Sequence, residues 1–242
     1  MKILDSELEK HIDSLIARYP SLEAIRREII DAYLCIETCY ERGGKLLIAG
    51  NGGSAADCEH IVGELMRRFQ TPRPVPSEFA EKLKRIDPVL GADLSRKLER
   101  SLTAIPLTAH ESLSTACMND VDAEVAFAQQ LYGFGRPGDV FLGISTSGNS
   151  KNIIAAAVVA KAMDIQVVAL TGRSVGALAE IADFCVRAPA DETYMIQELH
   201  LPIYHCWCMM LEHRFFVTIP SGRGKGSRKR RPERRPFRRR GR

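Results

Sequence analysis

The stretch "LLIAGNGGSAADCEHIVGELMRRF", residues 46–69, decides the predicted fold. Its apolar run ends at Gly50, and a turn rich in glycine follows before a helix-like segment begins near Ser54. Glycine lets the backbone approach a ligand closely, and the N–H groups at the start of a helix can bind an anion. His60 and Glu64 are four residues apart, so a helix places both side chains on one face. The stretch therefore predicts a strand, a ligand-binding turn and a helix that carries two polar groups.

The composition predicts one globular domain that does not enter a membrane. The chain has 242 residues, of which 45% are hydrophobic, enough for one sizeable core. No apolar run approaches the roughly 20 residues that cross a bilayer, and the N-terminus is charged and amphipathic rather than signal-like. The seven cysteines are an odd number without a CxxC pair, which predicts reduced, buried thiols. We therefore expect a cytoplasmic protein.

The charge is distributed unevenly along the chain. Residues 221–242 hold 12 of the 34 Lys and Arg residues and only 1 of the 30 Asp and Glu residues. The remaining 220 residues therefore carry 22 basic and 29 acidic side chains, a net charge of −7. A tail so rich in Arg, Gly and Pro cannot bury enough apolar surface to fold, so we predict a domain over residues 1–220 and a disordered tail. A run of arginines would also contact nucleic acid non-specifically.

Short apolar runs alternate with helix-like segments through the predicted domain. The predicted strands are residues 45–50, 102–107, 139–145, 165–172 and 183–189. The predicted helices are residues 5–18, 21–42, 54–69, 111–132, 149–163, 175–181 and 193–216. Nearly continuous apolar strands between helices are typical of a parallel sheet covered on both faces. We therefore predict a three-layer αβα domain of the α/β class, with a polar, partly helical insertion at residues 71–100.

A second candidate ligand-binding turn, "STSGNS" (residues 145–150), follows the third predicted strand. Ligands of open parallel sheets bind outside the carboxyl ends of the strands. Hydroxyl groups at the start of a helix suit a phosphate monoester, although simple helix capping explains Ser54 or Ser150 equally well. Two such turns at corresponding strand ends favour a phosphorylated ligand.

Four ordered motifs together resemble a known family. They are "GNGGSAADCEH", "GDVFLGISTSGNSKN", "VVALTG" and "IQELHLPIYH". Over roughly residues 5–216 the chain resembles the SIS (sugar isomerase) domain family, and within it the phosphoheptose isomerases. The resemblance implies a flavodoxin-like, five-stranded parallel sheet with N-terminal helices. It also implies a homotetramer with active sites at subunit interfaces.

The resemblance further implies the residues that bind a phosphorylated sugar. The phosphate loop would be Ser145, Thr146, Ser147 and Ser150. The rest of the sugar site would be Asn51, Gly52, Gly53, Ser54, Glu64, Arg68, Asn119, Asp120 and Gln197. Two features depart from the family pattern, namely the length of the 71–100 insertion and Tyr194, where the isomerases often carry a charged or small residue.

The implied reaction converts sedoheptulose 7-phosphate to D-glycero-D-manno-heptose 7-phosphate, a ketose to an aldose, in carbohydrate metabolism. A proton leaves C1 and another is added at C2 through an enediol, so the site needs groups that alternate between base and acid. The resemblance assigns this chemistry to Glu64 and His205. It also implies one zinc ion per chain, held by His60, Glu64, Gln197 and His205, which would polarise the substrate's oxygens or order the site.

Three alternatives remain open from the sequence. Some relatives are non-catalytic phosphosugar-binding proteins, among them a regulator of bacterial replication initiation that lacks the acidic and histidine pair. The presence of Glu64 and His205 favours catalysis here. An isomerase of another phosphorylated ketose is the second alternative. Nucleic-acid binding, the third, depends on the tail alone.

Overall fold

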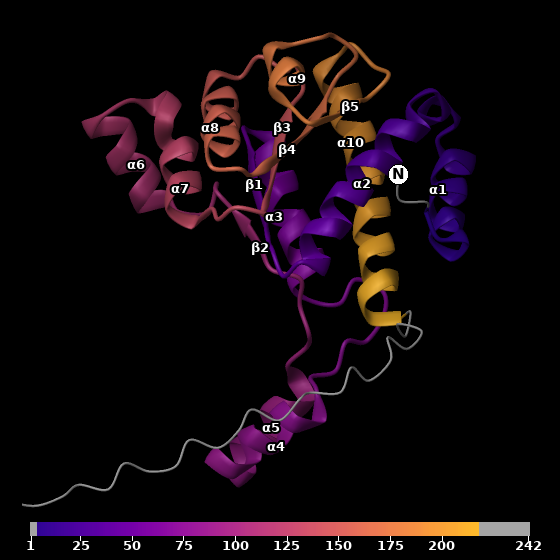
Figure 1. Cartoon of the computed structure of the whole chain (residues 1–242), viewed down its shortest axis with the longest axis vertical. Coiled ribbons are helices and arrows are strands. Elements are labelled where there is room, and N and C mark those ends of the chain that lie inside the picture. Colours follow the sequence, from indigo (N-terminus) through magenta and orange to yellow (C-terminus); the bar gives the residue numbers. More distant parts are fainter. Residues whose placement is uncertain (1–3, 218–242) are drawn as a thin grey trace, which may run out of the picture.

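The sheet at the centre of the computed structural model has five parallel strands, as the sequence predicts (Figure 1). The structure describes residues 4–217. The strands are β1 (Leu46–Gly50), β2 (Ala104–Pro106), β3 (Val140–Ser145), β4 (Gln166–Thr171) and β5 (Phe184–Arg187). Their order, β2-β1-β3-β4-β5, is the flavodoxin-like one, whose direction of winding reverses between β1 and β3. The two predicted ligand-binding turns therefore leave neighbouring strands at the same edge of the sheet.

Successive side chains of each strand face two different helical layers, because strand side chains alternate between faces. Leu46 and Ile48 of β1 belong to one apolar cluster, whereas Leu47 and Ala49 belong to the other. The first layer contains α1 (Ser6–Arg18), the 3₁₀ helix η1 (Pro20–Ile25), α2 (Arg26–Glu41), α3 (Gly53–Met66) and α10 (Thr193–Glu212). The second contains α7 (Ala126–Phe134), α8 (Lys151–Ala162) and α9 (Ala177–Ile181). The predicted three-layer αβα architecture is confirmed.

Two predicted helices are interrupted. The segment expected to be helical over residues 21–42 begins with η1, and α2 starts only at Arg26. The segment over residues 111–132 divides into α6 (Glu111–Asp120), η2 (Ala123–Val125) and α7. The break occurs because Val121 leaves the helical region and the Asp122 carboxylate accepts a hydrogen bond from Glu124 N–H, which starts a new turn.

The insertion at residues 71–100 forms a helical hairpin of α4 (Ser77–Ile86) and α5 (Pro88–Lys97), which confirms its partly helical character. Asp87 begins the second helix by accepting hydrogen bonds from Val89 and Leu90 N–H. Gly91 permits close packing, since a Cβ there would lie 2.2 Å from Leu83 O. The hairpin extends away from the sheet (Figure 1). Large apolar side chains on it, including Ile86, are exposed.

A buried ion pair ties the ends of α3 and α10 together. Arg73 Nε donates to Glu212 Oε1 at 2.8 Å, and both side chains are almost fully buried. The same guanidinium donates to the carbonyl oxygens of Glu64 and Leu65 at the end of α3. These carbonyls lie in the last turn of the helix, where no intrahelical N–H reaches them.

The Glu212 carboxylate also organises the chain between α3 and Arg73. It accepts hydrogen bonds from the backbone N–H groups of Phe69, Gln70 and Thr71 at 2.9–3.0 Å. Burial alone would raise the pKa of Glu212, but these N–H groups and Arg73 lower it overall. A carboxylate with this many donors stays charged inside the protein, and the C-terminal ends of α3 and α10 are held in a fixed relation.

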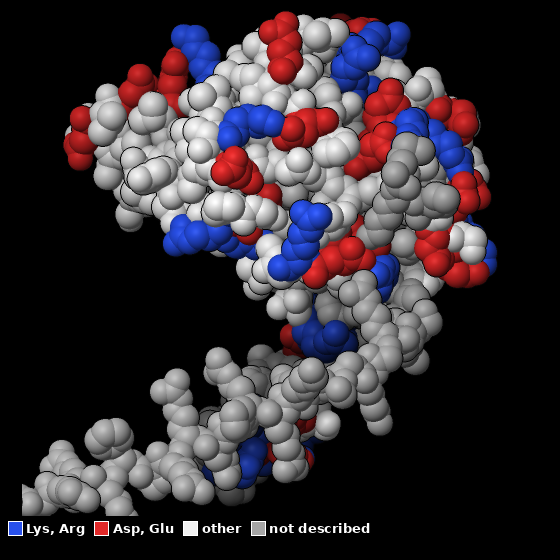
Figure 2. Space-filling view, in the orientation of Figure 1, with Lys and Arg blue, Asp and Glu red and all other residues white. Residues whose placement is uncertain are grey.

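Several other sequence expectations concern the chain as a whole. All seven cysteines are free thiols and six of them are buried, as predicted. Among residues 4–217, no helix is long and apolar enough to cross a membrane. Lys, Arg, Asp and Glu side chains are interspersed over the face of the domain in Figure 2. The predicted disordered tail, residues 221–242, lies outside the described residues.

Replacing Glu212 by alanine should strongly destabilise the fold. Glu212→Ala leaves the Arg73 guanidinium and three backbone N–H groups buried without their acceptor, a loss of about 3–5 kcal/mol in the free energy of unfolding. Urea denaturation measures it. Glu78→Ala, which removes the partner of Lys82 from an exposed pair, serves as the control and should leave the urea midpoint unchanged. Equal midpoints for the two variants would contradict the role given to Glu212.

Candidate active site

α3 and α10 lie side by side and run in the same direction. Near the start of both helices, the Gln197 side chain packs on Gly53, where an added Cβ would lie 2.7 Å from Gln197 Nε2. Further along, the Tyr204 hydroxyl donates to Asp57 Oδ1 at 3.1 Å. At the C-terminal ends of the two helices, Glu212 of α10 accepts hydrogen bonds from Arg73 and from the backbone that follows α3. The glycine at position 53 therefore makes room for a polar side chain from the facing helix.

His60 lies at the centre of a polar cluster between the two helices. Its Nε2 atom is 3.3 Å from Glu64 Oε1, one turn further along α3. The same atom is 3.5 Å from His205 Nε2 on α10, and the two rings meet edge to face at 4.9 Å between centroids. The structure thus brings together three of the residues to which the family resemblance assigns proton transfer or metal binding.

His205 occupies a half-buried position suited to a base. Its ring packs against Phe69 at 5.3 Å between centroids, beside a cavity of about 150 Å³ lined also by Arg18. Burial lowers the pKa of His205, and the nearby His60 and Arg18 lower it further. A lowered pKa keeps the imidazole neutral at pH 7, which is the form that can accept a proton.

The predicted zinc ligands are not arranged as a ready-made metal site. Among residues 4–217, no three His, Cys, Asp or Glu side chains form a group that could hold a metal ion. Gln197 lies against Gly53, and its eight-residue separation from His205 is a rise of about 12 Å along a helix. Zinc binding would therefore require these side chains to move, and it stays a prediction.

The turns after β1 and β3 are joined by an amide pair. Asn51 Nδ2 donates to Asn152 Oδ1, and Asn152 Nδ2 donates to Asn51 Oδ1, each at 2.9 Å. Sequence reasoning identified Asn51 but not Asn152, which lies on the first turn of α8. The one feature of the sequence that indicates a role for Asn152 in ligand binding is its position two residues after Ser150. The reciprocal pair holds the two predicted ligand-binding turns against each other.

The serine-rich turn is held by its own hydrogen bonds. Ser145 Oγ and Ser150 Oγ are 2.9 Å apart, and Asn149 N–H donates to Ser147 Oγ. Gly148 has φ +67°, a left-handed conformation that favours glycine. A Cβ at Gly176 would lie 2.6 Å from Gly148 O, so the two glycines allow α9 to approach the turn. The turn is therefore preformed at the start of α8, where N–H groups can receive an anion.

The other predicted sugar-binding residues have different surroundings. Ser54 is buried under Gly50, and Gly52 precedes α3 with φ +54°. Arg68 is exposed, and its Nε atom lies 3.4 Å from Glu99 Oε1. Asn119 donates to Asp120 at the end of α6, where both are exposed. Within residues 4–217, the contacts of Arg68, Asn119 and Asp120 do not link them to the two turns or to His60.

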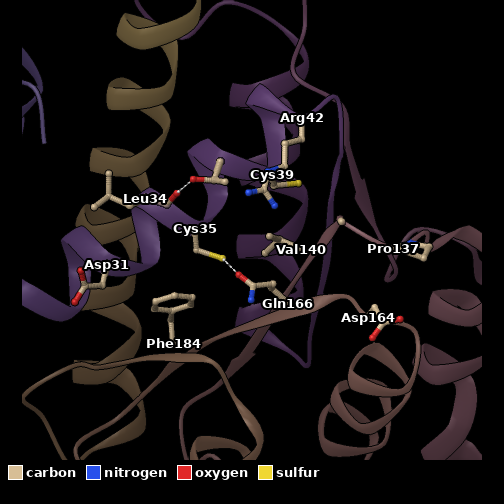
Figure 3. A pocket seen from close by; sticks show the side chains of 12 residues that line it. Asp31, Leu34, Cys35, Cys39, Arg42, Pro137, Val140, Asp164, Gln166 and Phe184 are labelled. Carbon is tan, nitrogen blue, oxygen red and sulfur yellow. Dashed lines mark hydrogen bonds between the residues drawn. The ribbon is translucent and has the colours of Figure 1, made fainter. Parts of the chain in front are cut away.

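A separate cavity of about 660 Å³ lies at the opposite edge of the sheet (Figure 3). Val140, Gln166 and Phe184, at the amino ends of β3, β4 and β5, form part of its wall. Cys35 Sγ donates to Gln166 Oε1 there, and burial raises the pKa of Cys35 to about 12. The thiol therefore stays protonated and is a poor nucleophile. We place the candidate active site at the turns after β1 and β3 and on the α3–α10 pair, because the polar residues described above gather there.

Comparison with known sequences gives consistent results. The SIS domain family model matches residues 95–172. The phosphoheptose isomerase of Akkermansia muciniphila is 38% identical over 185 residues, which are 76% of this chain and 84% of that protein. Phosphoheptose isomerase 2 of Campylobacter jejuni is 37% identical over 219 residues, which are 89% and 96% of the two chains.

Solved structures that are similar to this chain include two phosphoheptose isomerases. The phosphoheptose isomerase of Francisella tularensis superimposes with a TM-score of 0.67 at 30% identity, covering 86% of this chain and 97% of that one. The phosphoheptose isomerase of Neisseria gonorrhoeae superimposes with a TM-score of 0.64 at 31% identity, covering 85% of this chain and 97% of that one.

Proposed function

The chain belongs to the phosphoheptose isomerase family of SIS-domain proteins, and we propose that it isomerises sedoheptulose 7-phosphate to D-glycero-D-manno-heptose 7-phosphate. The observation that carries the proposal is the cluster of His60, Glu64 and His205 on the α3–α10 pair, together with the two preformed turns, at the first of which α3 begins. α3 leads from the first turn to the cluster, so the predicted phosphate site and the proton-transferring groups lie at different positions along the same helix. This separation suits a ligand whose phosphate lies several carbon atoms from its reacting carbonyl group.

The phosphate binds at the turn that contains Ser145, Thr146, Ser147 and Ser150. Hydroxyl groups and the N–H groups at the start of α8 supply its hydrogen bonds, and the helix dipole favours its negative charge. Asn51, Gly52 and Gly53 line the sugar beyond the phosphate, together with Gln197. Because the turns are joined by the Asn51–Asn152 pair, they hold the substrate without first having to order themselves.

Proton transfer occurs at the other end of the substrate. Glu64 or His205 removes a proton from C1 while the C2 carbonyl oxygen gains one, which forms the enediol. The C1 hydroxyl group then loses its proton, C2 receives one, and the aldose results. Each group acts first as a base and then as an acid, so neither is consumed. The neutral form of His205, favoured by its lowered pKa, is ready to accept a proton.

The alternative functions have less support. Relatives that are 33–42% identical are named as isomerases, which does not favour a non-catalytic binding protein. The homotetramer, the cytoplasmic location and the contacts of Arg68, Asn119 and Asp120 with the sugar stay predictions. Exposed positions of these three residues are compatible with a site completed by a second subunit. Light scattering measures the oligomeric state. Nucleic-acid binding depends on a tail outside the described residues.

Loss of either acid–base group should abolish most of the turnover. We expect Glu64→Gln and His205→Ala each to lower kcat for sedoheptulose 7-phosphate by about 100-fold or more, since a positioned acid or base contributes this much. Conversion of ketose to aldose is the assay, and circular dichroism checks the fold. Glu59→Gln, a carboxylate on the exposed side of α3, should keep normal turnover. Near-normal rates in Glu64→Gln or His205→Ala would remove that residue from the mechanism.

Zinc binding is proposed separately, with His60, Glu64, Gln197 and His205 as its ligands. The ion would supply a Lewis acid at the substrate's oxygens. Protein dialysed against zinc should retain about one ion per chain by elemental analysis, and His60→Ala should retain much less. Glu59→Ala is the matched control on the same helix. Full turnover in a metal-free preparation would restrict the four residues to polar contacts.

A further inference from the structure

The hydroxyl group of Tyr204 joins Asp57 to His60 across the contact between α10 and α3. Its oxygen lies 3.1 Å from Asp57 Oδ1 and 3.1 Å from His60 Nδ1. Tyr204 is only 1% exposed, and its ring meets the His60 ring edge to face at 5.7 Å between centroids. The hydroxyl group is therefore held between these two partners.

The number of available protons decides the direction of both hydrogen bonds. An ionised carboxylate only accepts hydrogen bonds, whereas a tyrosine hydroxyl has a single proton to donate. With Asp57 ionised, the Tyr204 proton points at Asp57, which leaves the hydroxyl oxygen as an acceptor toward His60. The contact with His60 is then a hydrogen bond only if Nδ1 carries a proton.

A proton on Nδ1 determines what the other ring nitrogen can do. In neutral imidazole the second nitrogen has a free lone pair. In His60 this nitrogen is Nε2, the atom that lies 3.3 Å from Glu64 and 3.5 Å from His205. We propose that Asp57 and Tyr204 are positioning residues that hold His60 in its Nδ1–H tautomer and direct the Nε2 lone pair toward Glu64 and His205.

The proposed tautomer complements the acid–base pair. The Nε2 lone pair can accept a hydrogen bond from Glu64 when its carboxyl group is protonated, or from the N–H group of His205. These are the two groups that receive protons in the proposed reaction. In the opposite tautomer, His60 Nε2–H would instead donate a hydrogen bond to the Glu64 carboxylate and occupy one of its oxygens. The effect on turnover rests on the proposed function, whereas the tautomer itself does not.

Imidazole ¹⁵N NMR tests the tautomer without any substrate. Protein labelled at its histidine nitrogens and freed of metal with a chelator is measured at about pH 8, above the ordinary histidine pKa, and His60 is assigned from the signals lost in His60→Gln. We expect the proton on Nδ1 in the intact protein. A His60 signal with the proton on Nε2 would overturn the proposal, whether or not the protein turns over sedoheptulose 7-phosphate.

Two substitutions test which groups set the tautomer. Tyr204→Phe removes the acceptor for Nδ1–H, and Asp57→Ala frees the Tyr204 proton to point at Nδ1, so both should shift His60 toward its Nε2–H form. Tyr33→Phe is the matched control, because Tyr33 is fully buried and its hydroxyl has no hydrogen-bond partner within residues 4–217. Its His60 signals should be unchanged. An Nδ1–H form that persists in both Tyr204→Phe and Asp57→Ala would overturn the assignment.

Turnover supplies a second readout for the same variants. We expect Tyr204→Phe to lower kcat by about tenfold or more while KM changes by less than about twofold, because the substrate contacts are untouched. Tyr33→Phe should match the unsubstituted protein. Equal losses in Tyr204→Phe and Tyr33→Phe would point to a general effect of losing a buried hydroxyl group and would contradict a positioning role.

Discussion

The ion pair between Arg73 and Glu212 is the interaction on which the arrangement of the candidate site depends. It is buried where α3 and α10 end, and it satisfies the last carbonyl groups of α3 and three backbone N–H groups beyond that helix. A buried pair gives little net stability unless its hydrogen bonds are complete, and here they are nearly complete. The ion pair matters for the site because it fixes α3 relative to α10, and these two helices carry His60, Glu64 and His205.

The sheet supplies the second half of the site. A doubly wound sheet places the turns after β1 and β3 together at the point where the winding reverses. The Asn51–Asn152 pair and the hydrogen bonds of the serine-rich turn then fix their shape. In the proposed function, the sheet thus determines where the phosphate binds, and the α3–α10 pair determines where protons move. α3 connects the two regions because it begins at the first turn.

Much of this fold follows from local sequence. The five apolar runs predicted the five strands, because a strand buried on both faces needs apolar residues throughout. The motifs identified His60, Glu64 and His205, which the structure brings together. Asp57, Tyr204 and Asn152 were missed because their roles arise from contacts between helices and turns far apart in the chain. The Arg73–Glu212 pair spans 139 residues, and no spacing rule could reveal it. Nothing local to Gln197 could show that its amide lies against Gly53.

The central claim is that the α3–α10 cluster moves protons between a substrate carbon and an acid–base group. Incubating the protein with sedoheptulose 7-phosphate in deuterated water, with NMR or mass spectrometry of the aldose product, tests this claim most directly. A proton taken up by Glu64 or His205 can exchange with solvent, so the account predicts deuterium at C2 of the product. An aldose formed without deuterium at C2 would indicate a direct hydride shift from C1 and would contradict the account.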